Sequence, residues 1–347
     1  SPPDPIRIGF IGGLNGRVAD LGEGGRNGVQ LAVEEKNRAG GIAGRRIELL
    51  VRDDGQKPEQ AEQAAQELIA SGVVAIVGPM TSAMAASVLK VTEPAGVTVV
   101  SPTVTARDFS GRDDLFFQVM PNTTREARMG AKYHLRKGIR KVVAIADHAN
   151  SAYTQSWLED FRQELVAGGG AVAELAFNSG QKVDDAAVVE EALASHPDAI
   201  VVLASAVDAG RLAQQIRRRN ARLPMLTSMW AGTDKLIELG GGAVEGMTMH
   251  QYFDRMSTAP RYIEFQARYQ ERFKQPSGFP GMAGYDAAQA VLEALERRRA
   301  GTSLKESLLQ NGPFSGVQGE VRFNATGDSE RAPSVAVIRN GRFVMAD

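Results

Sequence analysis

The chain has 347 residues, which is too long for one ordinary hydrophobic core, so we expect two lobes. Its formal net charge of -1 gives no reason to expect a nucleic acid or an anionic membrane as partner. The absence of cysteine excludes disulfide bonds and thiolate metal sites, and no apolar run approaches the roughly 20 residues of a membrane-spanning helix.

The chain opens with Ser1-Pro2-Pro3-Asp4-Pro5, a short polar, proline-rich lead into an apolar segment. A start of this kind, without Met, is typical of an exported protein whose signal peptide has been removed. A chain cut at a domain boundary would look the same.

Strands and helices alternate from the N-terminus. Residues 6–11 predict a buried strand, and the glycine-rich loop 12–16 after it is neither a dinucleotide fingerprint nor a P-loop. We expect a helix over 24–37, a strand over 46–52 and a helix from Pro58, a residue that suits a first helical turn.

The next stretch predicts one βαβ unit. Two short apolar runs, 73–77 and 97–100, have the composition of buried parallel strands. Between them we expect a helix over 83–92 that Pro94 and Gly96 end. The crossover should be right-handed.

Hydroxyl side chains follow both strands of this unit. Thr81 and Ser82 come after the first strand, where either can cap the helix, and Thr103-Val104-Thr105 comes after the second. Open α/β sheets bind ligands at the carboxyl ends of their strands, and a helix N-terminus favours an anion. In the alternative interpretation, Ser82 is only a helix cap and the threonines are only turn residues. The four hydroxyls together favour a carboxylate site.

The alternation restarts after residue 121, so we expect a second lobe of the same type. The expected strands are 116–119, 142–146, 171–177, 199–203, 225–227, 247–253, 320–323, 335–338 and 343–345. The expected helices are 124–136, 151–167, 184–195, 208–219, 258–274 and 282–299. Residues 312–319 are expected to form a loop.

No motif for catalysis is present. The four histidines are scattered without zinc-ligand spacing, and there is no G-x-S-x-G nucleophile elbow. Asp53 and Asp54 are adjacent and point apart, so they make a poor acid–base pair. We therefore expect no catalytic residue, metal or cofactor. Trp230, in the turn after a strand, is a better candidate for contact with a ligand.

The chain resembles the leucine/isoleucine/valine-binding type of periplasmic solute-binding protein, the type I "Venus flytrap" receptors of ABC importers. The resemblance is carried by the segments AVEEKNRAGGI, RRIELLVRDD, IVGPMTSAMA and VVSPTVTA, with weaker matches at DHANSAYTQSW and GYDAAQAVLEAL.

The resemblance implies an α/β fold of two Rossmann-like lobes with parallel sheets, joined by a three-strand hinge. It places the N-terminal lobe at 1–121 plus 251–327 and the C-terminal lobe at 122–250 plus 328–347. The ligand would lie between lobes that close on it. The liganded form would then dock on a membrane permease in the periplasm, and we expect the protein to be a monomer.

Site residues carry over by motif. Ser82 and the loop from Thr103 to Thr105 resemble the positions that hold the α-carboxylate and ammonium of an amino acid, with the Thr103 carbonyl and the Thr105 hydroxyl as contacts. Tyr153 resembles the aromatic residue that covers the ligand from the second lobe. Leu21 stands where a site side chain is often aromatic.

Two departures from the family pattern concern the second lobe. The acid that pairs the ligand's ammonium should fall near Met229-Trp230, where this chain has none. The aromatic residue expected after the strand 199–203 is replaced by Ser205-Ala206.

A buried ammonium without a carboxylate would be costly. Either another acid substitutes, with Asp208 and Asp286 as possibilities, or the ligand is an apolar or aromatic carboxylate that packs on Trp230 and Tyr153. The first hypothesis is an importer receptor for a small carboxylate, in particular a branched-chain or other apolar amino acid. The second is the sensor domain of a signalling receptor. A nucleotide-dependent enzyme is disfavoured because no phosphate-binding loop is present.

Overall fold

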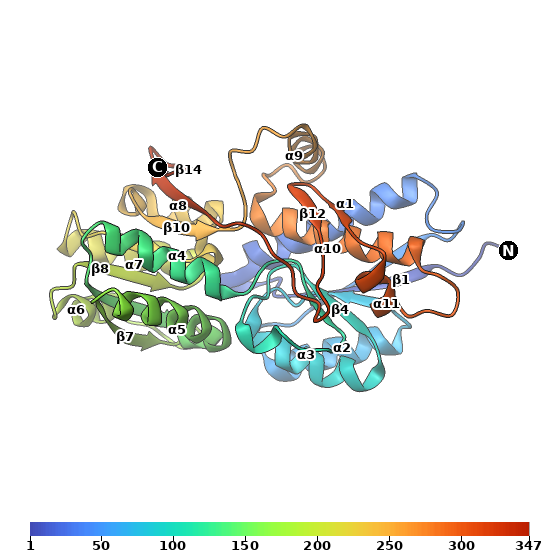
Figure 1. Ribbon diagram of the computed structural model, residues 1–347, viewed down its shortest axis with the longest axis horizontal. Helices are drawn as coiled ribbons and strands as arrows, with labels where there is room; N and C mark the ends of the chain where they lie inside the picture. The colour runs from blue at the N-terminus through green and yellow to red at the C-terminus, as the bar shows by residue number, and fades with distance from the viewer. Residues whose placement is uncertain (347) are drawn as a thin grey trace. The chain divides into compact units, whose positions relative to one another are not determined.

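The computed structural model describes residues 1–346, which fold into two compact units (Figure 1). Unit 1 comprises Ser1–Thr105, Phe109–Pro121 and Ser257–Arg331, and unit 2 comprises Ala106–Asp108, Asn122–Met256 and Ala332–Asp347.

The units differ from the predicted lobes at three places, each with a local reason. Residues 106–108 belong to unit 2, where Arg107 pairs with Asp160. Unit 2 also continues past residue 250, because the Tyr252 hydroxyl accepts the backbone N–H of Glu126 in helix α4 (Thr123–Arg136). Unit 1 continues past residue 327, because the Ser329 hydroxyl donates to the Val119 carbonyl.

Unit 1 is built on a parallel five-stranded sheet in the order β2-β1-β3-β4-β5. Its strands are β1 (Ile6–Gly12), β2 (Ile47–Asp53), β3 (Ala75–Val77), β4 (Thr98–Ser101) and β5 (Phe116–Gln118), with a separate antiparallel pair β11 (Phe314–Gly316) and β12 (Gly319–Val321). Its α-helices are α1 (Ala19–Arg38), α2 (Pro58–Ala70), α3 (Ser82–Ala95), α9 (Pro260–Phe273), α10 (Gly278–Arg297) and α11 (Leu304–Gln310).

Unit 2 is built on a seven-stranded sheet in the order β14-β13-β10-β9-β8-β6-β7. Its strands are β6 (Lys141–Asp147), β7 (Ala171–Phe177), β8 (Ala199–Leu203), β9 (Met225–Thr227), β10 (Thr248–Gln251), β13 (Ser334–Arg339) and β14 (Arg342–Met345). Its α-helices are α4 (Thr123–Arg136), α5 (Ser151–Ala167), α6 (Asp185–Leu193), α7 (Ala206–Arg219) and α8 (Asp234–Gly240). Among the described strands of this sheet, only β13 runs opposite to the rest: it pairs antiparallel with β10 on one side and with β14 on the other.

The two sheets share one topology. With β6 counted as the first strand of unit 2, its parallel part has the order 2-1-3-4-5, which is the order of unit 1. The predicted α/β fold with a repeated lobe of parallel strands is thereby confirmed. In this order the strand sequence reverses between the first and third strands, and ligands bind beside the carboxyl ends of those strands.

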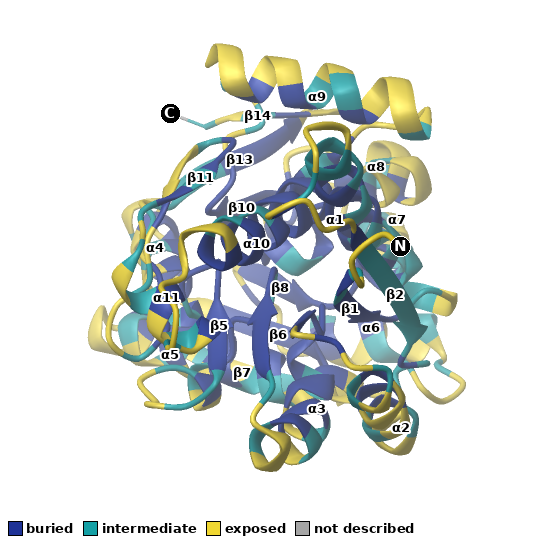
Figure 2. Ribbon diagram, turned by 90° about the vertical axis from the view of Figure 1, so that its right-hand side faces the viewer, coloured by how far each residue is buried: buried dark blue, intermediate teal, exposed yellow. Residues whose placement is uncertain are grey.

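Helix α10 forms much of the core of unit 1, and it is dark blue along most of its length in Figure 2. It packs against α1 at close range. A Cβ atom added to Gly28 of α1 would lie 2.1 Å from the Gly281 carbonyl oxygen of α10, so glycine is required at this crossing.

Several boundaries differ from those predicted. Helix α1 begins at Ala19 rather than 24, and Gly22 in its first turn packs against the backbone of Gly13. Helix α3 continues through Pro94 to Ala95. Proline is tolerated there because it removes only one hydrogen bond, close to the end of the helix. The segment 312–319 contains a strand, β11, that pairs with β12, and helices α8 and α11 were not predicted.

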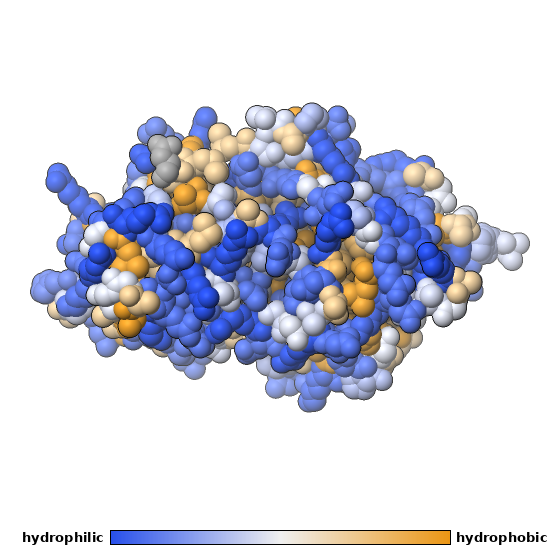
Figure 3. Space-filling model, in the orientation of Figure 1, coloured by the Kyte–Doolittle hydropathy of each residue, from blue (hydrophilic) through white to orange (hydrophobic). Residues whose placement is uncertain are grey.

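On the face drawn in Figure 3, hydrophilic residues predominate and hydrophobic residues form small separate patches. Over residues 1–346 none of the helices has the length and apolarity needed to cross a bilayer. The same residues contain no cluster of three or more His, Cys, Asp or Glu side chains arranged for a metal ion.

Candidate functional site

Unit 1 places the predicted hydroxyls at the point where its strand order reverses. Strand β3 ends at Val77, and Gly78 follows with a φ of +121°. A Cβ atom there would lie 2.2 Å from the Ile11 carbonyl oxygen of β1, so the chain can leave β3 this close to β1 only as glycine. The turn then leads into the N-terminus of α3.

Thr81 and Ser82 occupy the end of α3 in different ways. Thr81 is the N-cap residue, yet its hydroxyl makes no cap bond and instead donates to the Gln56 side chain at 3.1 Å. Ser82 is the first helical residue, so the alternative that Ser82 is only an N-cap is wrong. Both side chains are buried, and both lie where the backbone N–H groups of α3 begin.

The loop after β4 lies against this turn. The Thr103 hydroxyl donates to the Met80 carbonyl at 2.6 Å, and the Val104 N–H donates to the Ser101 hydroxyl at 3.0 Å. These bonds hold the loop beside the start of α3 and commit the Thr103 side chain to unit 1 itself. Thr105 is 3% exposed, and Leu21 lies buried in the first turns of α1.

In unit 2, Tyr153 and Trp230 form an aromatic pair. Their ring centroids are 5.7 Å apart with an interplanar angle of 77°, an edge-to-face contact. Tyr153 belongs to α5, whereas Trp230 lies in a short 3-10 helix, η4 (Met229–Ala231), rather than in a simple turn. Tyr153 is buried, which raises the pKa of its hydroxyl well above the usual value, while Trp230 is half-buried.

Ser205 and Ala206 start helix α7, which packs against η4. Ser205 is the N-cap, and its hydroxyl exchanges hydrogen bonds with Asp208, donating to the carboxylate at 3.1 Å. The Asp208 carboxylate is also paired with Arg211 at 2.7 Å. The Ser205 side chain therefore already has a structural role as a cap.

A buried acid from another element, Glu126, lies beside Met229 in space. This residue lies in the first turn of α4, 103 positions earlier in the chain, and is 1% exposed. Its Oε1 accepts the backbone N–H of Met229 at 3.3 Å and the indole N–H of Trp157 at 3.2 Å. Burial raises the pKa of Glu126 from 4.5 to about 7.

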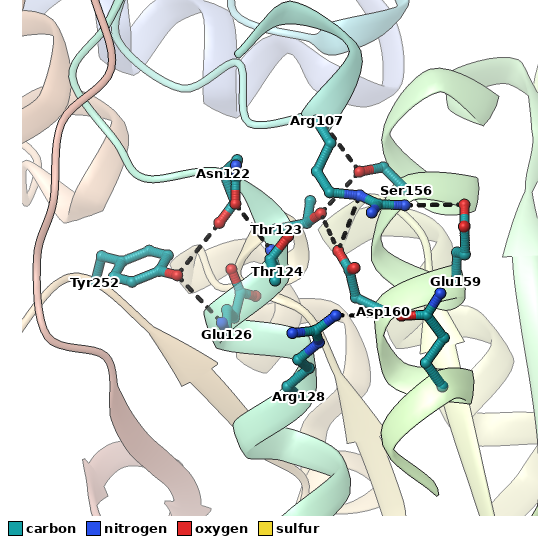
Figure 4. Close-up of polar contacts among 11 residues, drawn as sticks. Arg107, Asn122, Thr123, Thr124, Glu126, Arg128, Ser156, Glu159, Asp160 and Tyr252 are labelled. Carbon is teal, nitrogen blue, oxygen red and sulfur yellow. Dashed lines mark hydrogen bonds and ion pairs between the residues drawn. The ribbon is translucent and has the colours of Figure 1, made fainter. Parts of the chain in front are cut away.

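Tyr252 fixes the backbone of this turn. Figure 4 shows its hydroxyl accepting the N–H of Glu126, at 3.1 Å, and donating to the Asn122 carbonyl, at 3.3 Å. Nearby in the same view, Thr123 donates to the Asp160 carboxylate, which Arg107 neutralises. The first turn of α4 is thus held rigidly by side chains from α5 and from the segment after β10.

Neither acid named from the sequence as a substitute is free of a cation partner. Asp208 pairs with Arg211, and Asp286 in unit 1 pairs with Arg331 at 3.2 Å. Glu126 was overlooked because an acid in the first turn of a helix ordinarily serves the helix dipole in solvent. No local signal in the sequence marks its burial.

Comparisons with known proteins agree with this architecture. A family model described as "Periplasmic binding protein" matches residues 5–341. The Leu/Ile/Val-binding protein BraC3 of Rhizobium johnstonii is 33% identical over 239 residues, a match that spans 66% of this chain and 65% of that relative. The Leu/Ile/Val-binding protein homolog 3 of Brucella melitensis is 26% identical over 341 residues, 96% of this chain and 91% of that relative.

Two solved structures share the fold over nearly the whole chain. The leucine binding protein LivK of Thermotoga maritima has a TM-score of 0.89 and 25% identity, covering 99% of this chain and 98% of its own. The branched-chain amino acid transporter substrate binding protein LivJ of Streptococcus pneumoniae, in complex with isoleucine, has a TM-score of 0.89 and 25% identity, covering 98% and 97%.

These relatives and neighbours are named as binding proteins, and LivJ is named as the substrate binding protein of a transporter. A role in binding a solute outside the cytoplasm follows from the family. Because the family model covers residues 5–341 and the fold repeats over both units, the chain belongs to the periplasmic binding protein family.

Proposed function

We propose that the chain is the extracytoplasmic, periplasmic receptor of an ABC importer and binds a small carboxylate, in particular a branched-chain or other apolar amino acid. The permease of that importer would be its protein partner. The observation that carries the proposal is the group of hydroxyls in unit 1 at the N-terminus of α3, beside the carboxyl ends of β3 and β4. The names of the relatives, Leu/Ile/Val-binding proteins, support the choice of ligand class.

Each proposed contact has a chemical reason. Backbone N–H groups at the start of α3 and the hydroxyls of Ser82 and Thr105 are hydrogen-bond donors suited to a carboxylate. The backbone of Thr103-Val104 supplies a carbonyl for an ammonium. Thr81 shapes the turn, and Leu21 offers apolar contact from the same unit.

Unit 2 would contribute the apolar part of the site. Tyr153 and Trp230 present aromatic surface, and Met229 and Ala206 are apolar and buried nearby on η4 and α7. Ser205 would act through the position of α7, since its hydroxyl caps that helix.

The same aromatic pair favours a second candidate ligand, an amino-free aliphatic or aromatic carboxylate. Such a ligand would use the hydroxyls of unit 1 and the rings of unit 2 without needing an acid. Isocaproate and hydrocinnamate, the amino-free counterparts of leucine and phenylalanine, represent this class.

The test is isothermal titration calorimetry of the whole chain with L-leucine, L-isoleucine, L-valine, L-phenylalanine and these two amino-free acids. Ser82→Ala should lower the affinity for whichever acid binds by roughly tenfold to a hundredfold, the value of a hydrogen bond to a charged group. Ser87→Ala, on the same helix but one turn further, is the matched control and should leave the affinity unchanged. Equal affinities in the two variants, or no binding by any of the acids, would reject the proposal.

A further inference from the structure

Among the described residues, Glu126 is one of three buried acids that have no arginine partner. Three other buried carboxylates are each paired with an arginine: Asp160 with Arg107, Asp208 with Arg211 and Asp286 with Arg331. The other two, Asp54 and Asp147, each accept two N–H groups on one oxygen, Asp54 from the backbone and side chain of Gln56 and Asp147 from the backbone of Ala149 and Ser179. Within residues 1–346, Glu126 has no cation partner, and both of its hydrogen bonds fall on one oxygen, Oε1.

The surroundings of Glu126 hold it in place without neutralising it. The titratable groups nearest to it are the hydroxyls of Tyr153 on α5 and Tyr252 after β10, and burial raises the pKa of both, so they stay uncharged. Two charged residues act on Tyr252 from neighbouring positions, Arg125 and Asp160, with opposite signs. A rigid, desolvated carboxyl group with an unused oxygen lies next to η4.

We propose that Oε2 of Glu126 accepts the ammonium group of an amino-acid ligand, which makes this residue the determinant that separates amino acids from amino-free carboxylates. The proposal rests on the proposed function, which it refines by naming the ligand class. It is carried by the hydrogen bond from Met229 N–H, which places the carboxyl group directly against the segment 229–230, beside the Tyr153–Trp230 pair.

An ammonium group at this position would offset the cost of burying the carboxylate. A buried ion is tolerated when an opposite charge and hydrogen bonds replace its water. An amino-free ligand offers no such partner and would leave Glu126 protonated. Since the pKa of Glu126 in the absence of ligand is about 7, an amino acid should release a proton from the protein when it binds near neutral pH.

The experiment compares Glu126→Gln with the wild-type chain by titration calorimetry, using L-leucine with isocaproate and L-phenylalanine with hydrocinnamate. Glutamine keeps the acceptor for Trp157 and Met229 but removes the charge. We expect a loss of roughly thirtyfold or more for the amino acid, because one partner of a buried charge pair is removed, and a change below about threefold for its amino-free counterpart. Glu174→Gln, a half-buried glutamate on β7 of the same unit, is the control and should change neither.

A second measurement needs no variant, so it holds even if Glu126→Gln does not fold. Titrations of the wild-type chain with L-leucine in buffers of different ionisation enthalpy report the protons exchanged on binding. We expect net proton release near neutral pH with the amino acid and none with isocaproate.

The outcomes separate the two proposals. Binding of amino acids by the wild type, with Glu126→Gln unchanged and no proton release, overturns the role of Glu126 and leaves the proposed function intact. Binding of amino-free acids alone also overturns it. Failure of every acid to bind the wild-type chain rejects the proposed function and this inference together.

Discussion

The ligand-free protein should become more stable when Glu126 is replaced by glutamine, and increasingly so as the pH rises. The pKa of Glu126 is raised from 4.5 in the unfolded chain to about 7 by burial. The folded state therefore holds this proton more tightly than the unfolded state. The stability that the protonated carboxyl contributes is present in full below about pH 4.5 and is lost as the pH rises through about 7.

The magnitude follows from the size of the shift. Each pKa unit corresponds to about 1.4 kcal/mol, so the shift amounts to about 3 kcal/mol. Glutamine does not titrate and offers the same oxygen to the N–H groups of Met229 and Trp157. The free energy of unfolding of Glu126→Gln minus that of the wild type should rise by about 3 kcal/mol between about pH 5 and about pH 8.

Urea denaturation of both proteins at a series of pH values measures this difference directly. Other titrating groups, including the buried Asp286 and the histidines, are common to both proteins and cancel. Two curves that stay parallel across this pH range would refute the reasoning, because Glu126 would then have the same proton affinity in the folded and unfolded states. Added L-leucine should narrow the gap at high pH, since it binds the wild type more tightly and therefore stabilises it more than the variant by mass action.

Two further predictions concern other buried ionisable groups. Burial lowers the pKa of His134 and of His250 to about 4, so the free energy of unfolding should fall by about 3 kcal/mol for each residue as the pH drops from about 6.5 to about 4. His250→Asn should make this fall less steep in urea denaturation. An unchanged dependence on pH would contradict a lowered pKa for His250. Arg331→Met should destabilise the protein by about 3–5 kcal/mol, because it leaves Asp286 buried without its cation. Adding Asp286→Asn should restore most of the lost stability. A double variant no more stable than Arg331→Met alone would contradict this account.

The parts of the site that depend on local pattern were predictable from the sequence. Apolar β-branched runs identify β3 and β4, and the residues directly after a parallel strand must lie at its carboxyl end. The sequence therefore predicts Thr81, Ser82 and Thr103 at one edge of the sheet, and the bond from Thr103 to the Met80 carbonyl shows the two loops in contact.

Features that depend on tertiary packing were not predictable. Gly22 lies before the predicted start of the helix at 24, yet it is helical. A Cβ atom there would lie 1.8 Å from the Gly13 carbonyl oxygen, a close approach that no local pattern in the sequence indicates. The contact between Glu126 and Met229 joins positions 103 residues apart, and no periodicity within α4 specifies which residue α4 faces. Resemblance to a family identifies only the position where an acid is usual, so a carboxyl group supplied by another element goes unnoticed.

The energetics of Glu126 argue that its charge has a use. A role confined to holding Trp157 and Met229 requires one acceptor oxygen, which an amide supplies without titrating. The carboxyl group performs the same role at a cost of about 3 kcal/mol above neutral pH, a large share of the stability of an ordinary protein. Departures of this kind from local stability rules are expected where a fold binds its ligand. An ammonium group placed on Oε2 would give the carboxylate the counter-charge that the three arginine-paired acids of the chain already have.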